Sequence, residues 1–233
     1  MGHHIAIIED DPAIRRLVTF LLVHEGFEVT AHETVQHARD AWQVGGYPEL
    51  LILDLMLPDE DGLSLCRSLR EAPEAAHLPI LALTARDQTV DKYEAYNAGF
   101  DGYLVKPFDP LELIYKIRAF LRLTSREGEG VPTELGPASF RLAPARFTVV
   151  VNGTDITLTR LETALLTHLM QHPGEVFSAE ALAETVLFAH KGQVRTVDAV
   201  HAHIRNLRGK LEPDPKQPTR IRTMGRRGYY FDA

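Results

Sequence analysis

The chain has 233 residues, of which 45% are apolar and 24% are charged, proportions that are typical of a globular protein. Its single cysteine, Cys66, excludes a framework of internal disulfides and favours a reducing setting. No apolar run approaches the length of a membrane helix, and the start does not resemble a signal peptide. We therefore expect a cytoplasmic protein without a membrane partner.

The net charge of −7 conceals a difference between the two ends of the chain. Residues 1–122 hold 11 Lys and Arg against 20 Asp and Glu, which gives a net charge of −9. From residue 191 onward there are 10 basic and 4 acidic residues, which gives +6. We therefore expect only the last part of the chain to meet a polyanion.

Residues 1–122 alternate short apolar runs with amphipathic helical patterns. The runs have the continuous apolar character of buried parallel strands, and they cover 4–8, 27–31, 50–53, 80–83 and 102–105. The helical patterns cover 12–25, 34–44, 63–71, 88–98 and 110–122. Asp11 precedes the first helix at the position of an N-cap. Five strand–helix units predict a doubly wound α/β domain with a five-stranded parallel sheet.

Residues 123–136 lack apolar periodicity and contain Gly, Pro, Ser and charged residues, which predicts a linker. Short strands are then expected at 140–142, 147–151 and 155–158, with an Asn152-Gly153 turn between the last two. Helices are expected at 160–171, 178–186 and 196–211, followed by strands at 220–223 and 228–231 around a Gly-Arg-Arg turn. This order predicts an α+β winged helix-turn-helix domain over residues 137–233.

Polar side chains stand at the carboxyl ends of the predicted parallel strands, where open α/β sheets bind ligands. The first strand leads into Glu9 and Asp10, and the third, fourth and fifth lead into Asp54, Thr84 and Lys106. Clustered carboxylates need a cation to offset their repulsion, and their oxygens suit Mg²⁺. A lysine and a hydroxyl are suited to holding phosphoryl oxygens. The set predicts a phosphoryl-transfer site with an aspartate as acceptor.

Four segments resemble the receiver-domain signature of response regulators: Glu9-Asp10, residues 54–62 (DLMLPDEDG), residues 83–85 (LTA) and residues 103–108 (YLVKPF). The resemblance implies that Asp54 accepts phosphate from a sensor histidine kinase. It implies one Mg²⁺ ion, held by Asp10, Asp54 and the backbone carbonyl of Met56, with Glu9 acting through water.

The same resemblance implies a switch. The hydroxyl of Thr84 moves to the phosphoryl group, Lys106 binds that group, and the ring of Tyr103 turns inward. It also implies that Lys106 precedes a cis-proline. Asp11 we assign to helix capping rather than to the metal.

Three other interpretations stay open. A haloacid-dehalogenase-like phosphatase also uses an aspartate at a strand end, but it needs a second Asp two residues later, where this chain has Met56. A binding switch that is not an enzyme therefore fits better. The chain is alternatively a DNA-binding protein that ignores phosphorylation and uses the first domain only to dimerise. A weaker alternative gives the second domain an RNA or protein target.

Residues 137–233 resemble the OmpR/PhoB-type winged helix, through segments 158–166, 172–178, 195–198, 203–211 and 228–231. The resemblance implies that a helix beginning near Arg195 enters the major groove of DNA and that an arginine of the hairpin enters the minor groove. The residues expected to contact DNA are Arg195, Thr196, His201, Arg205, Arg208, Lys210, Arg226 and Arg227.

The chain departs from this family pattern in three places within the second domain. Gly225-Arg226 stands at the hairpin tip where Arg-Gly is usual, and Leu187 stands where a Trp is common. About three residues are added after Asp198, and Ala199-Val200-His201 is one way to place them. The register of the base-reading residues is therefore open.

In the first domain, Asp101-Gly102 stands where the family has Asp-Asp, which removes one carboxylate from the face through which phosphorylated members dimerise. The residues expected on or near that face are Lys92, Asp101, Glu112, Lys116, Arg118 and Arg122. The family resemblance implies a homodimer that binds promoter DNA at repeated half-sites and acts through RNA polymerase.

Overall fold

The computed structural model of the chain describes residues 2–85, 92–125, 134–137, 139–186 and 194–232. It divides into two compact units, Met1–Arg122 and Leu123–Ala233, and each has its own sheet and apolar core. Within the described part of the chain, no helix is both long enough and apolar enough to cross a membrane.

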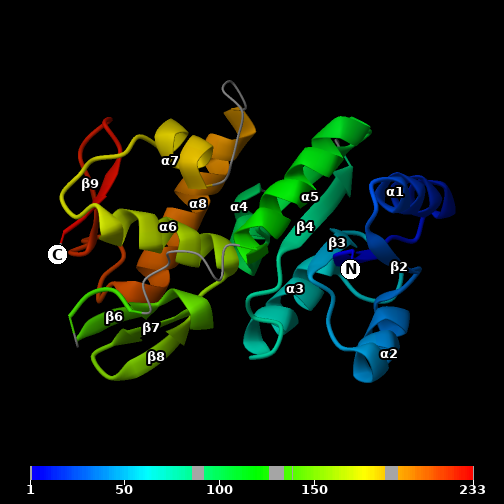
Figure 1. Ribbon diagram of the computed structural model, residues 1–233, viewed down its shortest axis with the longest axis horizontal. Coiled ribbons are helices and arrows are strands. Elements are labelled where there is room, and N and C mark those ends of the chain that lie inside the picture. Colours follow the sequence, from blue (N-terminus) through cyan, green and yellow to red (C-terminus); the bar gives the residue numbers. More distant parts are fainter. Residues whose placement is uncertain (1, 86–91, 126–133, 138, 187–193, 233) are drawn as a thin grey trace. The chain divides into compact units, whose positions relative to one another are not determined.

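The first unit is built on a parallel sheet of five strands in the order β2-β1-β3-β4-β5 (Figure 1). Every residue of the central strand β3 is buried, which explains its unbroken apolar run before the terminal aspartate. The strands are β1 (His4–Ile8), β2 (Glu28–His32), β3 (Leu50–Asp54), β4 (Ile80–Ala85) and β5 (Gly102–Lys106).

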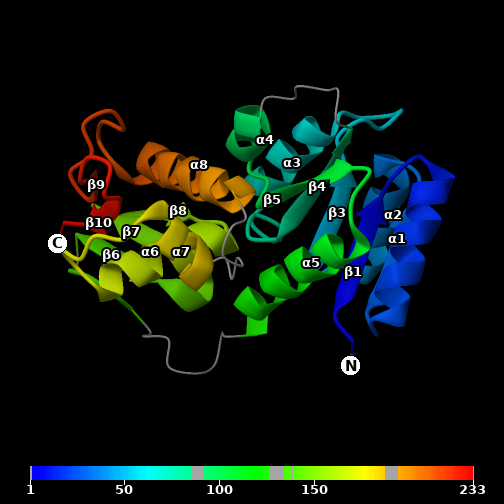
Figure 2. The same ribbon diagram turned by 90° about the horizontal axis from the view of Figure 1, so that it is seen from above.

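Helices cover both faces of this sheet, with α5 on one face and α3 and α4 on the other (Figure 2). The doubly wound α/β fold expected from the sequence is thereby confirmed. The helices are α1 (Pro12–His24), α2 (Val35–Gly45), α3 (Gly62–Glu71), α4 (Lys92–Ala98) and α5 (Pro110–Ser125). The first part of the expected helix 88–98 lies outside the described residues, and α5 continues three residues into the expected linker.

Polar residues before three of these helices set where each one begins. The side chain of Asp11 accepts hydrogen bonds from the backbone N–H groups of Ala13 and Ile14, so its expected capping role is confirmed. Thr34 caps α2 and Asp61 caps α3 in the same way. These caps define the loops at the carboxyl edge of the sheet, where the candidate site lies.

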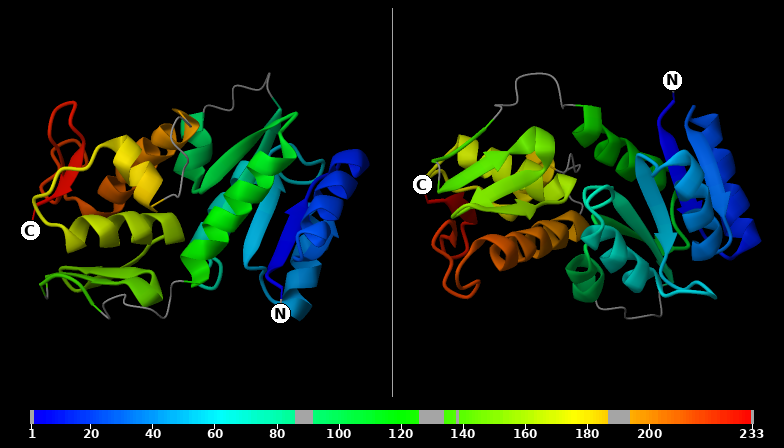
Figure 3. Two further views of the ribbon diagram at one scale, coloured as in Figure 1. Left: turned by 45° about the horizontal axis from the view of Figure 1, so that its top comes forward. Right: turned by 90° about the horizontal axis from the view of Figure 1, so that it is seen from below.

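The second unit combines a three-stranded antiparallel sheet, three helices and a terminal hairpin (Figure 3). This is the expected winged-helix layout. The strands are β6 (Phe140–Ala143), β7 (Thr148–Val151), β8 (Thr154–Thr157), β9 (Ile221–Thr223) and β10 (Tyr229–Phe231), with the 3₁₀ turn η1 (Pro144–Arg146) after β6. The helices are α6 (Arg160–Gln171), α7 (Ala179–Val186) and α8 (Val194–Leu211).

Two tight turns in this unit need positive backbone φ angles. Asn152 and Gly153 have φ values of 50° and 84° between β7 and β8, which matches the expected hairpin turn. Gly228, with φ of 134°, lies against the carbonyl of Phe177, where an added Cβ would stand 1.9 Å from that oxygen. Only glycine fits at this position, where β10 begins and the hairpin meets the segment before α7.

Candidate functional site

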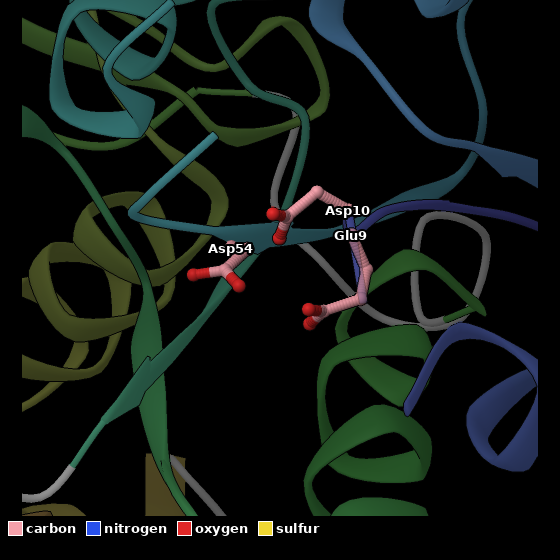
Figure 4. Close-up of side chains that lie close together, drawn as sticks. All are labelled: Glu9, Asp10 and Asp54. Carbon is pink, nitrogen blue, oxygen red and sulfur yellow. The ribbon is translucent and has the colours of Figure 1, made fainter. Parts of the chain in front are cut away.

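Three carboxylates gather at the carboxyl edge of the first sheet, as the sequence predicts. Glu9 and Asp10 follow β1, and Asp54 ends β3, the strand that pairs with β1. Each offers a carboxylate oxygen that lies within 4.8 Å of the others (Figure 4). Glu9 and Asp54 are buried, whereas Asp10 is exposed. The cluster is thus open to solvent on one side.

Lys106, from the end of β5, reaches into this cluster. Its Nζ lies 2.6 Å from Oε2 of Glu9 and 2.5 Å from Oδ2 of Asp54. Burial by itself would lower the pKa of Lys106, but hydrogen bonds to Asp54 and Glu9 outweigh that effect and raise it. Burial also raises the pKa of Glu9 to about 7, in opposition to the hydrogen bond from Lys106. Lys106 therefore stays charged and is the cation that now offsets the carboxylates.

The loop after Asp54 is held in a tight form. Oδ1 of Asp54 accepts a hydrogen bond of 3.0 Å from the backbone N–H of Met56, and Met56 forms a bridge with Asp61. Gly62 passes so close that an added Cβ would lie 2.5 Å from the carbonyl oxygen of Asp54. The Met56 side chain is 57% exposed. The geometry explains why glycine follows Asp61 in this segment.

The residues present fit a hard divalent cation. The cluster offers carboxylate oxygens from two neighbouring strands within a small space, with one of its members exposed. Such oxygens are the ligands that Mg²⁺ prefers. Asp11 is directed to its helix instead, and the hydrogen bonds from Ala13 and Ile14 lower its pKa. The donor set thus matches the expected Mg²⁺ site at Glu9, Asp10 and Asp54.

Of the expected switch residues, Thr84 lies near the carboxyl end of β4, and Tyr103 lies near the start of β5. The hydroxyl of Thr84 is 3.4 Å from the carbonyl oxygen of Ala85, its hydrogen-bond partner. Tyr103 is 6% exposed, and the turn of its ring on phosphorylation stays a prediction. The peptide bond between Lys106 and Pro107 is cis, as expected.

Two arginines bind loops of this unit, although the sequence patterns did not single them out. Arg15, on α1, donates to the backbone carbonyls of Glu9 and Asp10. Arg70, on α3, donates to the carbonyl of Gly99 and to the carboxylate of Asp101. Arg15 binds the loop before its own helix, and Arg70 binds the loop before β5. Helical spacing alone gave no sign of these partners.

Asp101 corrects one expectation about the dimer face. Its side chain is 1% exposed, pairs with Arg70 at 2.9 Å and accepts the backbone N–H of Ile80. It is an internal anchor and not a surface carboxylate, because the loop before β5 turns it toward α3. The neighbouring Gly102 is buried, and a Cβ there would lie 2.9 Å from Cζ of Phe120. The ring of Phe120 thus occupies space that an aspartate would need.

The other expected dimer-face residues are placed along α5. Lys116 lies 3.8 Å from Glu112, and Arg118 pairs with Glu25 at the end of α1. Arg122 is exposed. The side chain of Lys92, which lies on α4, is outside the described residues, so its expected place on this face stays a prediction.

In the second unit, the expected base-reading helix is α8. The side chains of Arg195 and Thr196 lie outside the described residues, as does Leu187. Nδ1 of His201 lies 2.6 Å from the hydroxyl of Tyr229 on β10. Arg205 is exposed on the helix. His201 thus links the helix to the terminal hairpin.

Arg208 and Lys210, two of the residues expected to contact DNA, bind other elements of their own unit. Arg208 donates to the carbonyl of Ile221 and the hydroxyl of Thr223, and Lys210 lies 2.7 Å from the carboxylate of Glu162. The phase of α8 directs these two side chains to β9 and to the start of α6, so they brace the helix within its own unit. Lys210 is still exposed and Arg208 is partly exposed, and their contact with DNA stays a prediction.

The hairpin tip presents two further cations. Arg226 and Arg227 are exposed in the turn between β9 and β10, which begins at Gly225 with φ of 53°. Neither forms a hydrogen bond or ion pair through its side chain with another described residue. Cations in this position are suited to a narrow, negatively charged groove.

Known proteins match both units. The response regulator receiver domain matches residues 5–118, and the family described as transcriptional regulatory protein, C terminal, matches residues 153–231. The DNA-binding dual master transcriptional regulator RpaA of Synechocystis sp. is 38% identical over 232 residues, with 98% of this chain and 94% of the relative covered. Protein PetR of Rhodobacter capsulatus is 38% identical over 239 residues, with 97% and 95% covered.

Solved structures agree with these relatives. The response regulator DrrB of Thermotoga maritima, an OmpR/PhoB homologue, is 29% identical over the full length of both chains, with a TM-score of 0.50. A mutant of RitR has a TM-score of 0.78 over 99% of both chains, and its 24% identity supports the fold alone. The chain belongs to the OmpR/PhoB-type two-component response regulators, which are transcriptional regulators with a receiver domain and a DNA-binding C-terminal domain.

Proposed function

We propose that Asp54 accepts a phosphoryl group from a sensor histidine kinase and that this modification controls binding of promoter DNA. The observation that carries the proposal is the meeting of Asp54, Glu9, Asp10 and Lys106 at one sheet edge. An oxygen of Asp54 would form a bond to phosphorus while the P–N bond to the kinase histidine breaks. The imidazole leaves with the electron pair of that bond and takes a proton.

The residues around Asp54 have distinct roles in this proposal. Lys106 now contacts Oδ2 of Asp54, so it is placed to stay with the phosphoryl oxygens as a fixed charge. The hydroxyl of Thr84 would move to the phosphoryl group, and Tyr103 would be held inward when Thr84 moves. The N–H of Met56 fixes the orientation of the attacking carboxylate.

Glu9, Asp10, Asp54 and the backbone carbonyl of Met56 would hold one Mg²⁺ ion. When bound, the ion supplies positive charge that offsets the repulsion between the carboxylates and the incoming phosphoryl group. Glu9 is the most buried member, so it would act at the inner side of the site, whereas the exposed Asp10 faces the entry side.

The output follows as a shift of population. Phosphorylation would favour a symmetric homodimer through the face of α4, β5 and α5. Two joined winged-helix units bind neighbouring half-sites more tightly than one. In the second unit, α8 would enter the major groove and Arg226 and Arg227 the minor groove. RNA polymerase is the proposed downstream partner, and turnover of an external substrate is not part of this function.

The test is phosphorylation of the full chain by acetyl phosphate with Mg²⁺, followed by intact-mass analysis and binding to promoter fragments. The wild type should gain one phosphoryl group and bind DNA more tightly, with an affinity that falls as salt rises. Asp54→Asn should abolish both effects, whereas Asp40→Asn, a matched change on α2, should preserve both. Equal phosphorylation of the Asp54→Asn chain, or DNA binding that ignores phosphorylation, would overturn the proposal.

A further inference from the structure

Arg15 contacts the backbone of the two residues that begin the acidic cluster. It lies in the first turn of α1, and its Nη1 donates to the carbonyl oxygen of Glu9 at 2.6 Å and to that of Asp10 at 2.9 Å. Nη2 of the same guanidinium lies 3.9 Å from Glu33. The side chain is 20% exposed, so most of it is covered.

These two carbonyls belong to the segment in which the chain leaves the sheet, where the backbone N–H of Glu9 still donates to the carbonyl of His32 at 3.1 Å. The pairing of β1 with β2 and β3 ends at Ile8, and α1 begins at Pro12. The three residues between them include the two that bring carboxylates to the site. One guanidinium nitrogen bridging two successive carbonyls fixes the path of that segment, because both peptide groups must keep their orientation to keep their bonds.

The positive charge of Arg15 also stabilises this segment. Glu9 is fully buried, and each carboxylate of the cluster repels the others. Arg15 brings a permanent positive charge to the backbone of the segment without using a carboxylate oxygen. Lys106 already contacts the carboxylate of Glu9, and Arg15 does not add a second cation that competes for the carboxylate oxygens of Glu9 and Asp10.

We infer that Arg15 is a positioning residue for the divalent-cation site: it holds the carbonyls of Glu9 and Asp10 so that their carboxylates converge on Asp54. The inference rests on the proposed function, in which these residues hold Mg²⁺. Groups that orient metal ligands from outside typically contribute about 10- to 100-fold to metal affinity.

The neighbouring Arg16 is a matched control. It lies one residue further along the same helix, is exposed, and forms no hydrogen bond or ion pair with any residue that the structure describes. Arg15→Met and Arg16→Met remove the same charge at adjacent positions. Arg15→Lys keeps the charge but replaces the planar donor fork with a point charge.

The experiment compares these three full-length variants with the wild type. Mg²⁺ affinity is measured by calorimetric titration, and amide hydrogen exchange at residues 9–11 is measured in metal-free protein. Circular dichroism and the exchange of the core strands report whether each variant folds. The rate of phosphorylation by acetyl phosphate is followed against Mg²⁺ concentration.

We expect Arg15→Met to weaken Mg²⁺ binding about tenfold or more, to speed exchange at residues 9–11, and to leave the phosphorylation rate at saturating Mg²⁺ nearly unchanged. Arg16→Met should match the wild type. Equal Mg²⁺ affinity in the Arg15→Met and Arg16→Met chains would overturn the inference, as would wild-type affinity and exchange in Arg15→Lys. If Arg15→Met does not fold, Arg15→Lys decides by the same two measurements. A wild type that binds no Mg²⁺ would instead refute the proposed function.

Discussion

The contact between Gly102 and Phe120 makes a sharp prediction about stability. A Cβ at position 102 would lie 2.9 Å from Cζ of Phe120, whereas carbon atoms in favourable contact are about 3.5–4.0 Å apart. Overpacking of this kind costs about 1–3 kcal/mol. Replacing glycine within a strand recovers about 0.5–1 kcal/mol. Because the two effects oppose each other, Gly102→Ala should lower the free energy of unfolding of the receiver unit by up to about 2.5 kcal/mol, and by about 1 kcal/mol at the middle of both ranges.

Replacing Phe120 with a smaller side chain tests whether its ring causes that loss of stability. Phe120→Leu alone should cost about 1–1.5 kcal/mol, because it removes buried apolar volume. In the Phe120→Leu background, Gly102→Ala should then stabilise the unit by up to about 1 kcal/mol, which corresponds to a coupling energy of about 1–3 kcal/mol between the two positions.

The assay is urea unfolding of the full chain followed by tryptophan fluorescence. Trp42 is the one tryptophan of the sequence and lies in the receiver unit, where it is 8% exposed and packs on Tyr47. Its signal therefore reports this unit and not the DNA-binding unit. If Gly102→Ala costs the same with Phe or Leu at position 120, the ring does not fill the space at the glycine and the reasoning is refuted.

Three further predictions concern other parts of the chain. Burial raises the pKa of the Cys66 thiol to about 12, so the folded chain keeps a proton there that the unfolded chain loses above about pH 9. The free energy of unfolding should therefore fall as the pH rises beyond 9, and Cys66→Ala should lessen that fall in urea titrations. Gly228→Ala should destabilise the DNA-binding unit by about 3 kcal/mol or more in thermal unfolding, because the added Cβ would collide with the carbonyl of Phe177. Gly153→Ala should cost only about 1–2 kcal/mol, because a Cβ there has no neighbour within 4 Å and only the φ of 84° opposes it. Arg226→Ala with Arg227→Ala should leave thermal unfolding unchanged and reduce the salt dependence of DNA binding by about one to two phosphate contacts in a fluorescence anisotropy titration.

The order of strands and helices could be predicted from the sequence, because capping residues and apolar runs act on the element in which they stand. Asp11 before Pro12 predicts a helix start, and the solid apolar run before Asp54 predicts a buried strand. Parallel strands bring their carboxyl ends to one edge of the sheet, so the acidic cluster could also be predicted from the order of the strands.

The partners of long charged side chains did not follow from the sequence. Arg208 and Lys210 have the spacing of a solvated helix face, yet each binds an acceptor that lies far along the chain, on β9 or at Glu162. Asp101 has the sequence context of a loop, but it pairs with Arg70 inside the fold. Such choices depend on which element packs beside the helix, and spacing carries no information about that.

The internal contacts of Arg208 and Lys210 bear on how the DNA-binding unit works. Both residues, together with His201 and its contact to Tyr229, tie α8 to the hairpin or to α6. The helix and the hairpin tip are therefore held at a set spacing before DNA arrives. A surface organised in advance loses less conformational entropy on binding, so we expect these internal contacts to strengthen DNA binding indirectly. We then expect the exposed Arg226 and Arg227 at the tip and the exposed Arg205 on α8 to meet phosphates.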